Sequence, residues 1–157
     1  MRNIEIKARL KKPSEALAYA LHLCEGGPVE ELIQVDTYFN CESGRLKLRE
    51  VSGSRNHSEL IFYLRPDSTG PKASDYEISI ISQPETLKSL LAKAYGISVV
   101  VSKKRTLLMY RNVRIHLDQV KSLGDFIEFE AVMPEDSADS EGVAMLEFLR
   151  HEFGITS

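Results

Sequence analysis

The segment Arg2-Asn3-Ile4-Glu5-Ile6-Lys7-Ala8-Arg9-Leu10 alternates between polar and apolar residues along its length. Successive side chains of a β-strand point to opposite faces, so a strand here places Asn3, Glu5, Lys7 and Arg9 on one side. The other side then carries Ile4, Ile6, Ala8 and Leu10. The segment therefore predicts a strand with one apolar face and one face that bears both acids and bases.

Similar strand patterns recur along the chain between Gly, Asn, Ser and Pro residues. They cover residues 32–39, 45–51, 59–65, 76–81, 97–102, 104–110, 112–120 and 126–133. Three helices are predicted: one opens at Pro13 and stops at Gly26, one runs from Pro84 to Gly96, and one carries Leu146 and Leu149. Runs of strands interrupted by single helices predict an α+β fold with a mainly antiparallel sheet.

Length and composition limit the function classes. The 157 residues fit one domain, residues 1–157, and 43% apolar with 27% charged residues is typical of a globular chain rather than a disordered one. A net charge of −3 argues against a nucleic-acid or anionic-membrane partner, which usually selects an excess of Lys and Arg. Cys24 and Cys41 are expected to be free thiols. We find no signal peptide or membrane-length apolar run, so we expect a cytoplasmic protein. We also expect the protein to be a monomer or a homodimer.

Charged residues recur at every second position in three other predicted strands. They are Arg45, Lys47 and Arg49; Arg114, His116 and Asp118; and Glu128 and Glu130. Such faces are commonly the solvated side of a sheet whose other side covers a core. Alternatively, they line the lumen of a closed barrel, which at about eight strands has room for one small ligand.

A charged lumen has a chemical requirement. Buried charges are costly unless they are paired or bound to a ligand, and a polyanion with a divalent cation would satisfy both signs. Clustered carboxylates without a Cys/His set favour a hard cation, Mg²⁺ or Mn²⁺. No second His lies at a suitable spacing from His116, so we expect this residue to be a hydrogen-bond partner in the wall rather than a metal ligand.

Six short motifs occur in order along the chain. They are Asn3-Ile4-Glu5-Ile6-Lys7, Gln34-Val35-Asp36-Thr37-Tyr38-Phe39, Gly44-Arg45-Leu46-Lys47-Leu48-Arg49, Lys103-Lys104-Arg105, His116-Leu117-Asp118-Gln119-Val120 and Leu123-Gly124-Asp125-Phe126-Ile127-Glu128-Phe129-Glu130. Together they resemble the CYTH superfamily, the triphosphate tunnel metalloenzymes, which include class IV adenylyl cyclases, thiamine triphosphatases and inorganic triphosphatases. The resemblance covers nearly the whole chain.

This resemblance implies an eight-stranded antiparallel β-barrel, the triphosphate tunnel, with about three helices packed outside. It also implies roles for individual residues. The implied metal ligands are Glu5, Asp118, Glu128 and Glu130. The implied phosphate-binding residues are Lys7, Lys47, Arg49, Arg65, Arg105 and Arg114. The residues expected to act in catalysis are Glu5, Lys7 and Glu77, with Glu5 or Glu77 orienting water.

Three positions depart from the family pattern. Asn3 replaces the first acid of the E-x-E-x-K motif, which removes one negative charge from the implied metal site. Arg65 stands where a Lys is usual, which keeps the cation but changes a point charge into a fork. Asp75 stands where an Arg commonly lies two positions before the acid at Glu77.

The resemblance leaves three activities open. The leading expectation is metal-dependent hydrolysis of a triphosphate, foremost inorganic tripolyphosphate to pyrophosphate and phosphate, with ATP or thiamine triphosphate as other substrates. The first alternative is an adenylyl cyclase that makes cyclic AMP from ATP, which needs a pocket for adenine and ribose. The second is a noncatalytic triphosphate or polyphosphate sensor, motivated by Asn3.

Overall fold

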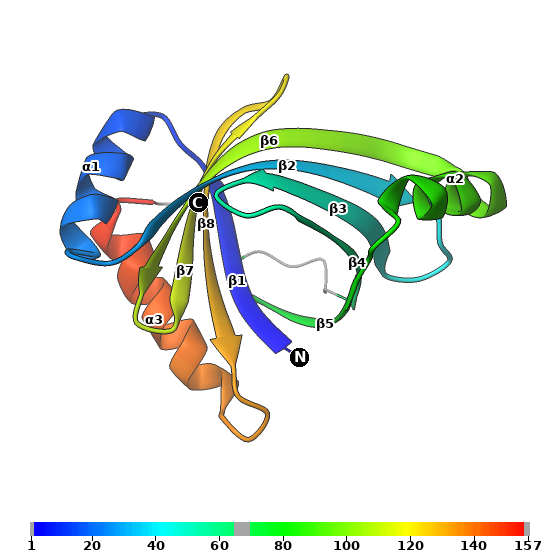
Figure 1. The fold of residues 1–157 in the computed structure, drawn as a ribbon. Coiled ribbons are helices and arrows are strands. Elements are labelled where there is room, and N and C mark those ends of the chain that lie inside the picture. The colour runs from blue at the N-terminus through cyan, green and yellow to red at the C-terminus, as the bar shows by residue number, and fades with distance from the viewer. Residues whose placement is uncertain (1, 65–69, 156–157) are drawn as a thin grey trace.

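The computed structural model describes residues 2–64 and 70–155 of the chain. Its strands are β1 (Arg2–Arg9), β2 (Val29–Phe39), β3 (Arg45–Gly53), β4 (His57–Leu64), β5 (Lys72–Ile80), β6 (Ile97–Tyr110), β7 (Val113–Val120) and β8 (Gly124–Met133). They form a closed barrel in the order β1-β5-β4-β3-β2-β6-β7-β8, and every neighbouring pair is antiparallel (Figure 1). The predicted α+β fold with an eight-stranded antiparallel barrel is confirmed.

Three helices lie outside the barrel: α1 (Pro13–Leu23), α2 (Pro84–Tyr95) and α3 (Asp139–Glu152). Both α1 and α2 begin at a proline, whose fixed φ and missing N–H suit the first helical position. Figure 1 shows α1 and α3 together on one side, with α3 against β8 and β1, and α2 far from them beside β2 and β3. None of the helices in the described part of the chain is long and apolar enough to cross a membrane.

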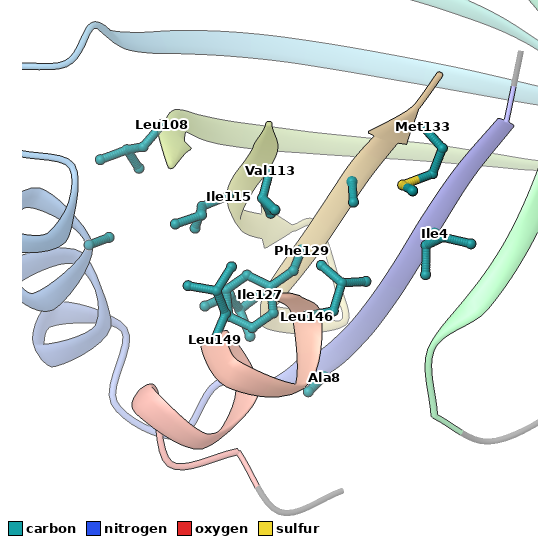
Figure 2. Packing of buried hydrophobic residues seen from close by; sticks show 12 residues of the cluster. Ile4, Ala8, Leu108, Val113, Ile115, Ile127, Phe129, Met133, Leu146 and Leu149 are labelled. Carbon is teal, nitrogen blue, oxygen red and sulfur yellow. The ribbon is translucent and has the colours of Figure 1, made fainter. Parts of the chain in front are cut away.

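The hydrophobic core lies between α3 and the outer faces of β1, β7 and β8 (Figure 2). Leu146 and Leu149 of α3 are fully buried there against Ile4 of β1 and Phe129 of β8. The apolar face of β1 is thus turned outward to the helices. Its polar face must therefore point into the barrel.

Strand β6 differs from the prediction, which divided residues 97–110 into two strands. The structure has one strand of 14 residues. Its middle, Ser102-Lys103-Lys104, contains no Gly or Pro, and β2 and β7 pair with it on both sides. The run of polar residues therefore marks a change of environment along one strand and not a turn. Strand β5 likewise begins at Lys72 rather than at Tyr76.

Candidate functional site

The barrel encloses a cavity of about 530 Å³ whose wall is largely charged. All eight strands contribute polar side chains to it, among them Asn3, Glu5, Lys7, Gln34, Tyr38, Lys47, Arg49, Glu59, Tyr63, Ser74, Tyr76, Lys103, Arg105, Arg114, His116, Glu128 and Glu130. The charged faces seen in the sequence therefore point inward. The alternative, that they are the solvated outer faces of an open sheet, is wrong because the sheet closes on itself.

Asp36 of β2 binds two cations of β3. It lies directly opposite Arg49 in the strand register and is fully buried. Arg49 donates from Nε to Oδ1 and from Nη2 to Oδ2, each at 2.8 Å, and Lys47 Nζ donates to Oδ2 at 3.2 Å. Burial alone would raise the pKa of Asp36, but the hydrogen bonds and charge of Arg49, together with Lys47, lower it well below its ordinary range.

Asp118 of β7 binds Arg105 of β6 in the same way. Arg105 donates from Nε to Oδ1 at 2.8 Å and from Nη2 to Oδ2 at 2.9 Å, and Lys103 Nζ lies 3.8 Å from Oδ2. Both carboxylate oxygens thus face a guanidinium, and Asp118 does not line the cavity. The predicted role of Asp118 as a metal ligand stays a prediction, because in this structure its two carboxylate oxygens accept hydrogen bonds from Arg105 instead.

In both clusters, burial and the charge of neighbouring arginines lower the pKa of the lysine. Burial and the nearby Arg49 lower the pKa of Lys47 to about 8. Burial, with Arg105 and Arg49, lowers the pKa of Lys103 to about 7. A bound anion would oppose both effects, because it stabilises the charged ammonium forms. This part of the cavity is therefore suited to an anion.

Acidic side chains occupy the neighbouring wall of β1 and β8. Glu5 lies opposite Glu130 in the register, and Lys7 lies opposite Glu128. Arg114 Nη1 donates to Glu130 Oε1 at 2.9 Å. Burial and then the charge of Glu128 raise the pKa of Glu130, and Glu5 adds to this effect. The carboxylates on this wall therefore repel one another.

His116 of β7 is hydrogen-bonded to the same wall, as expected from the sequence. Its Nδ1 lies 2.8 Å from Glu128 Oε1. Burial and the charge of Arg105 lower the pKa of His116 to about 4. The ring is thus neutral at pH 7, and Nδ1–H donates to the carboxylate. Against the effect of burial, this hydrogen bond lowers the pKa of Glu128 well below its usual value.

The donor chemistry of the acidic wall fits a hard divalent cation. Glu5, Glu128 and Glu130 supply carboxylate oxygens, and the buried Asn3 Oδ1 has no hydrogen-bond partner among the described residues. The side chains are not gathered into a ligand set as they stand, since no three His, Cys, Asp or Glu in residues 2–64 and 70–155 converge closely enough. The repulsion at Glu130 is the feature that a cation would relieve.

The remaining predicted residues fall into three groups. Lys7 and Arg114 line the cavity, as does Glu5. Arg65 lies outside the described residues. The prediction that Glu77 acts in the cavity is wrong, because Ser74, Tyr76 and Ile78 are the inward residues of β5. Glu77 is exposed on the outer face, opposite Phe62.

The sequence motifs contain two residues of the site for which no role was predicted. Lys103 lines the cavity, and Asp36 is buried behind the cations. The same alternation that selected Lys47 and Arg49 selects Lys103 with Arg105 two positions later. Glu59, which also lines the cavity, has no comparable signal because its strand carries mostly apolar neighbours. The two free thiols, Cys24 and Cys41, are as predicted.

Comparisons with known proteins agree with the motifs. The family model of the CYTH domain matches residues 1–157, and no curated protein matches the sequence significantly. The PH1012 protein of Pyrococcus horikoshii is similar in structure, with a TM-score of 0.81 and 22% identity over 99% of this chain and 92% of its own. A candidate adenylate cyclase from Vibrio parahaemolyticus has a TM-score of 0.77 and 19% identity, and the match covers 97% of this chain and 88% of that one. A chain of the Schizosaccharomyces pombe Mediator head module has a TM-score of 0.73 and 7% identity, and the match covers 98% of this chain and 95% of that one. At these identities the structural likenesses show the fold.

Proposed function

Because the chain belongs to the CYTH domain family, we propose that its barrel binds and hydrolyses a triphosphate with the help of a divalent cation. Members of this family are typically enzymes that take small triphosphate substrates, and they generally depend on a divalent metal. The substrate that we propose is inorganic tripolyphosphate, cleaved to pyrophosphate and phosphate. The observation that carries the proposal is the cavity of about 530 Å³, which is lined by the cations Lys47, Arg49, Lys103 and Arg105 and by the acids Glu5, Glu128 and Glu130.

The cations would act by electrostatics. Phosphoryl transfer places charge on the oxygens around the reacting phosphorus, and fixed donors in a poorly solvated site stabilise that charge. Lys47 and Arg49 from β3 and Lys103 and Arg105 from β6 supply such donors on one side of the cavity. Their partners Asp36 and Asp118 hold both arginines in place before substrate binds, so little reorganisation is needed.

The acidic wall would hold the divalent cation through Glu5, Glu128 and Glu130, with the Asn3 amide oxygen as a fourth donor. Such a cation polarises phosphoryl oxygens and lowers the pKa of a bound water. Lys7 and Arg114 lie on the same wall and would neutralise oxygens of the phosphate nearest to it. The two walls meet where Arg105 Nη2 lies 3.8 Å from Glu128 Oε1, so a polyanion and its cation would bind side by side.

Tripolyphosphate is favoured over a nucleotide by the lining of the cavity. The tyrosines that line it beside the basic cluster are Tyr38 and Tyr63, and both face Lys47 Nζ at 5.3 Å from the ring centroid. Rings engaged in this way are cation partners rather than open platforms for a base. The adenylate cyclase alternative would instead require an aromatic ring that can stack on adenine, and Tyr76 of β5 is the other tyrosine in the described part of the cavity wall.

A noncatalytic triphosphate-binding protein is the second candidate, and Asn3 is the observation that favours it. Replacing one acid by an amide leaves the acidic wall one negative charge short of the E-x-E-x-K motif. This would weaken cation binding while the basic wall stays intact. The candidate predicts tight triphosphate binding without turnover at any Mg²⁺ or Mn²⁺ concentration.

The test incubates the purified protein with tripolyphosphate, ATP and thiamine triphosphate in Mg²⁺ or Mn²⁺ and resolves products by phosphorus NMR. We expect pyrophosphate and orthophosphate from tripolyphosphate. Cyclic AMP and pyrophosphate from ATP would establish the cyclase instead. Binding of tripolyphosphate without any product would establish the noncatalytic candidate.

Two isosteric substitutions locate the reaction in the barrel. Glu130→Gln removes a charge from the acidic wall, and we expect it to raise the Mg²⁺ concentration for half-maximal activity at least about tenfold. Glu77→Gln removes the same charge from the outer face of β5 and should leave activity at the wild-type level. Equal behaviour of the two variants would contradict the metal-site proposal.

A further inference from the structure

Within the motif Gln34-Val35-Asp36-Thr37-Tyr38-Phe39, Asp36 has so far been described only as the partner that holds Arg49 in place. Gln34 and Tyr38 line the cavity from β2, and Asp36 lies between them with the same inward direction, but fully buried behind the cations. A fully buried carboxylate is costly unless its partners compensate for lost solvation. Asp36 therefore needs an explanation that a surface acid would not.

The contacts of Asp36 fix both neighbouring cations in one arrangement. Arg49 presents its Nε and Nη2 edge to the carboxylate through two parallel hydrogen bonds of 2.8 Å, which leaves its remaining N–H groups for the lumen. Lys47 Nζ shares Oδ2 at 3.2 Å. The rings of Tyr38 and Tyr63 each lie 5.3 Å from the same ammonium, and the Tyr38 hydroxyl is 3.4 Å from it.

The same construction occurs a second time in the barrel. In β3 and in β6 a Lys precedes an Arg by two residues, and an Asp of the neighbouring strand lies directly opposite that Arg. The four arginine hydrogen bonds in the two clusters span only 2.8–2.9 Å. The same arrangement thus occurs twice, on four different strands. This repetition indicates that the aspartates do more than neutralise one buried charge: they hold the cations in a fixed orientation.

We propose that Asp36 is a positioning residue for anion binding, which holds Lys47 and Arg49 on one carboxylate so that their free N–H groups meet a phosphoryl group. Asp36 itself does not touch the anion. This inference rests on the proposed function, since it concerns how the same cavity holds a polyphosphate. It differs from a purely structural role because Asp36 also raises the pKa of Lys47 against the effects of burial and Arg49, and anion binding depends on that charge.

The groups facing Lys47 determine what loss of Asp36 would do. They are Asp36 and Tyr38 of β2, Arg49 of β3, Tyr63 of β4 and Glu128 of β8. Burial and Arg49 lower the pKa of Lys47, whereas Asp36 and, more weakly, Glu128 raise it. Asp36→Asn removes the larger opposing effect, so the pKa of Lys47 must fall below about 8. Lys47 then loses its charge at lower pH.

The experiment measures tripolyphosphate binding by calorimetry in the presence of EDTA from about pH 6 to pH 9.5. Wild type is compared with Asp36→Asn and with Asp75→Asn, which removes the same charge from the exposed outer face of β5. Dividing the affinity of each variant by that of wild type at the same pH removes the effect of tripolyphosphate's own protonation. We expect Asp36→Asn to lose affinity about one pH unit earlier than wild type, which is about fivefold at pH 8 and approaches about tenfold near pH 9, while Asp75→Asn follows wild type.

A charge-preserving variant covers the case in which Asp36→Asn does not fold. Arg49→Lys keeps the net charge and Asp36 but replaces the fork by a point charge. We expect it to bind tripolyphosphate about tenfold more weakly at pH 7, because the second hydrogen bond to Asp36 is lost. Binding equal to wild type in Arg49→Lys, or superimposable pH profiles for Asp36→Asn and wild type, would overturn the inference alone. Absence of binding by wild type would overturn the proposed function as well.

Discussion

At the scale of single residues, the buried Lys103 lowers the stability of the folded protein but is suited to bind an anion. Lys103 is buried, and its ammonium has no carboxylate within hydrogen-bond distance among the described residues, since Asp118 Oδ2 is 3.8 Å away. Its pKa of about 7 shows that the folded protein disfavours the charged form. A binding group of this kind costs folding free energy that the ligand restores on binding.

Lys103→Met tests this trade-off. In wild type the unfolded chain binds the Lys103 proton more tightly than the folded one, so stability rises as pH increases from about 7 to 10.5. At pH 6, where the full cost is present, we expect the variant to gain about 1–4 kcal/mol in free energy of unfolding. The gain should shrink toward pH 10, and tripolyphosphate affinity should fall at pH 7. Urea denaturation at several pH values measures the first effect, and a variant less stable than wild type at pH 6 would contradict it.

Asp118→Ala has the opposite expected effect on stability. It leaves Arg105, which is 5% exposed, without its two hydrogen bonds. Removing one partner of a buried ion pair typically costs about 3–5 kcal/mol. We expect a loss of this size in urea denaturation, against almost none for Asp75→Ala on the outer face. If Asp118 were chiefly a metal ligand, its removal without metal would change stability little.

The inward direction of most site residues was predictable from alternation, but their partners were not. Period two places Lys47, Arg49 and Glu130 on inward faces, as found. The family resemblance implied a metal role for Asp118, but the cross-strand register that brings it opposite Arg105 has no local sequence signal. Glu77 was misplaced for a related reason: a shift of one position in a strand reverses the face of every side chain.

At the scale of elements, α3 determines which side of β1 faces the lumen. Leu146 and Leu149 are fully buried against the apolar face of β1 and β8 (Figure 2). Helix α2 contributes no buried side chain among its own residues. The helical spacing of both segments was visible in the sequence, whereas their different burial was not, because both show apolar residues at similar intervals.

Leu149→Ala tests the weight of α3 in the fold. Truncating a fully buried leucine removes apolar contacts and leaves a cavity, which costs about 2–5 kcal/mol. Leu90→Ala in α2 is the matched control, since Leu90 is 60% exposed and should lose less than about 0.5 kcal/mol. Thermal and urea unfolding measure both. Equal losses in the two variants would show that α3 is not the element that closes the core.

At the scale of the whole molecule, closure of the barrel gathers charges from distant parts of the chain. The cavity receives cations from β3 and β6 and acids from β1 and β8, which lie on different arcs of the barrel. The sequence indicated closure only through the number of strands and the family motifs. The long β6 was divided in two by that reasoning, yet its pairing with both β2 and β7 is what joins the two halves of the barrel.

Ligand binding should therefore stabilise the barrel as a unit. Tripolyphosphate at 100 times its dissociation constant is expected to add about 2.7 kcal/mol to the free energy of unfolding. Sulfate at the same ionic strength serves as the control for general anion effects. A melting temperature that rises equally with both anions would contradict a site shaped for a polyphosphate.

The central claim is that the charged lumen holds a triphosphate between its basic and acidic walls, and a crystal structure of the protein with tripolyphosphate and Mg²⁺ tests it most directly. The account predicts tripolyphosphate inside the barrel, with oxygens within hydrogen-bond distance of Lys47 and Lys103. It also predicts that the cation lies against Glu5, Glu128 and Glu130. Tripolyphosphate bound only on the outer surface, with an empty lumen at saturating concentration, would contradict it.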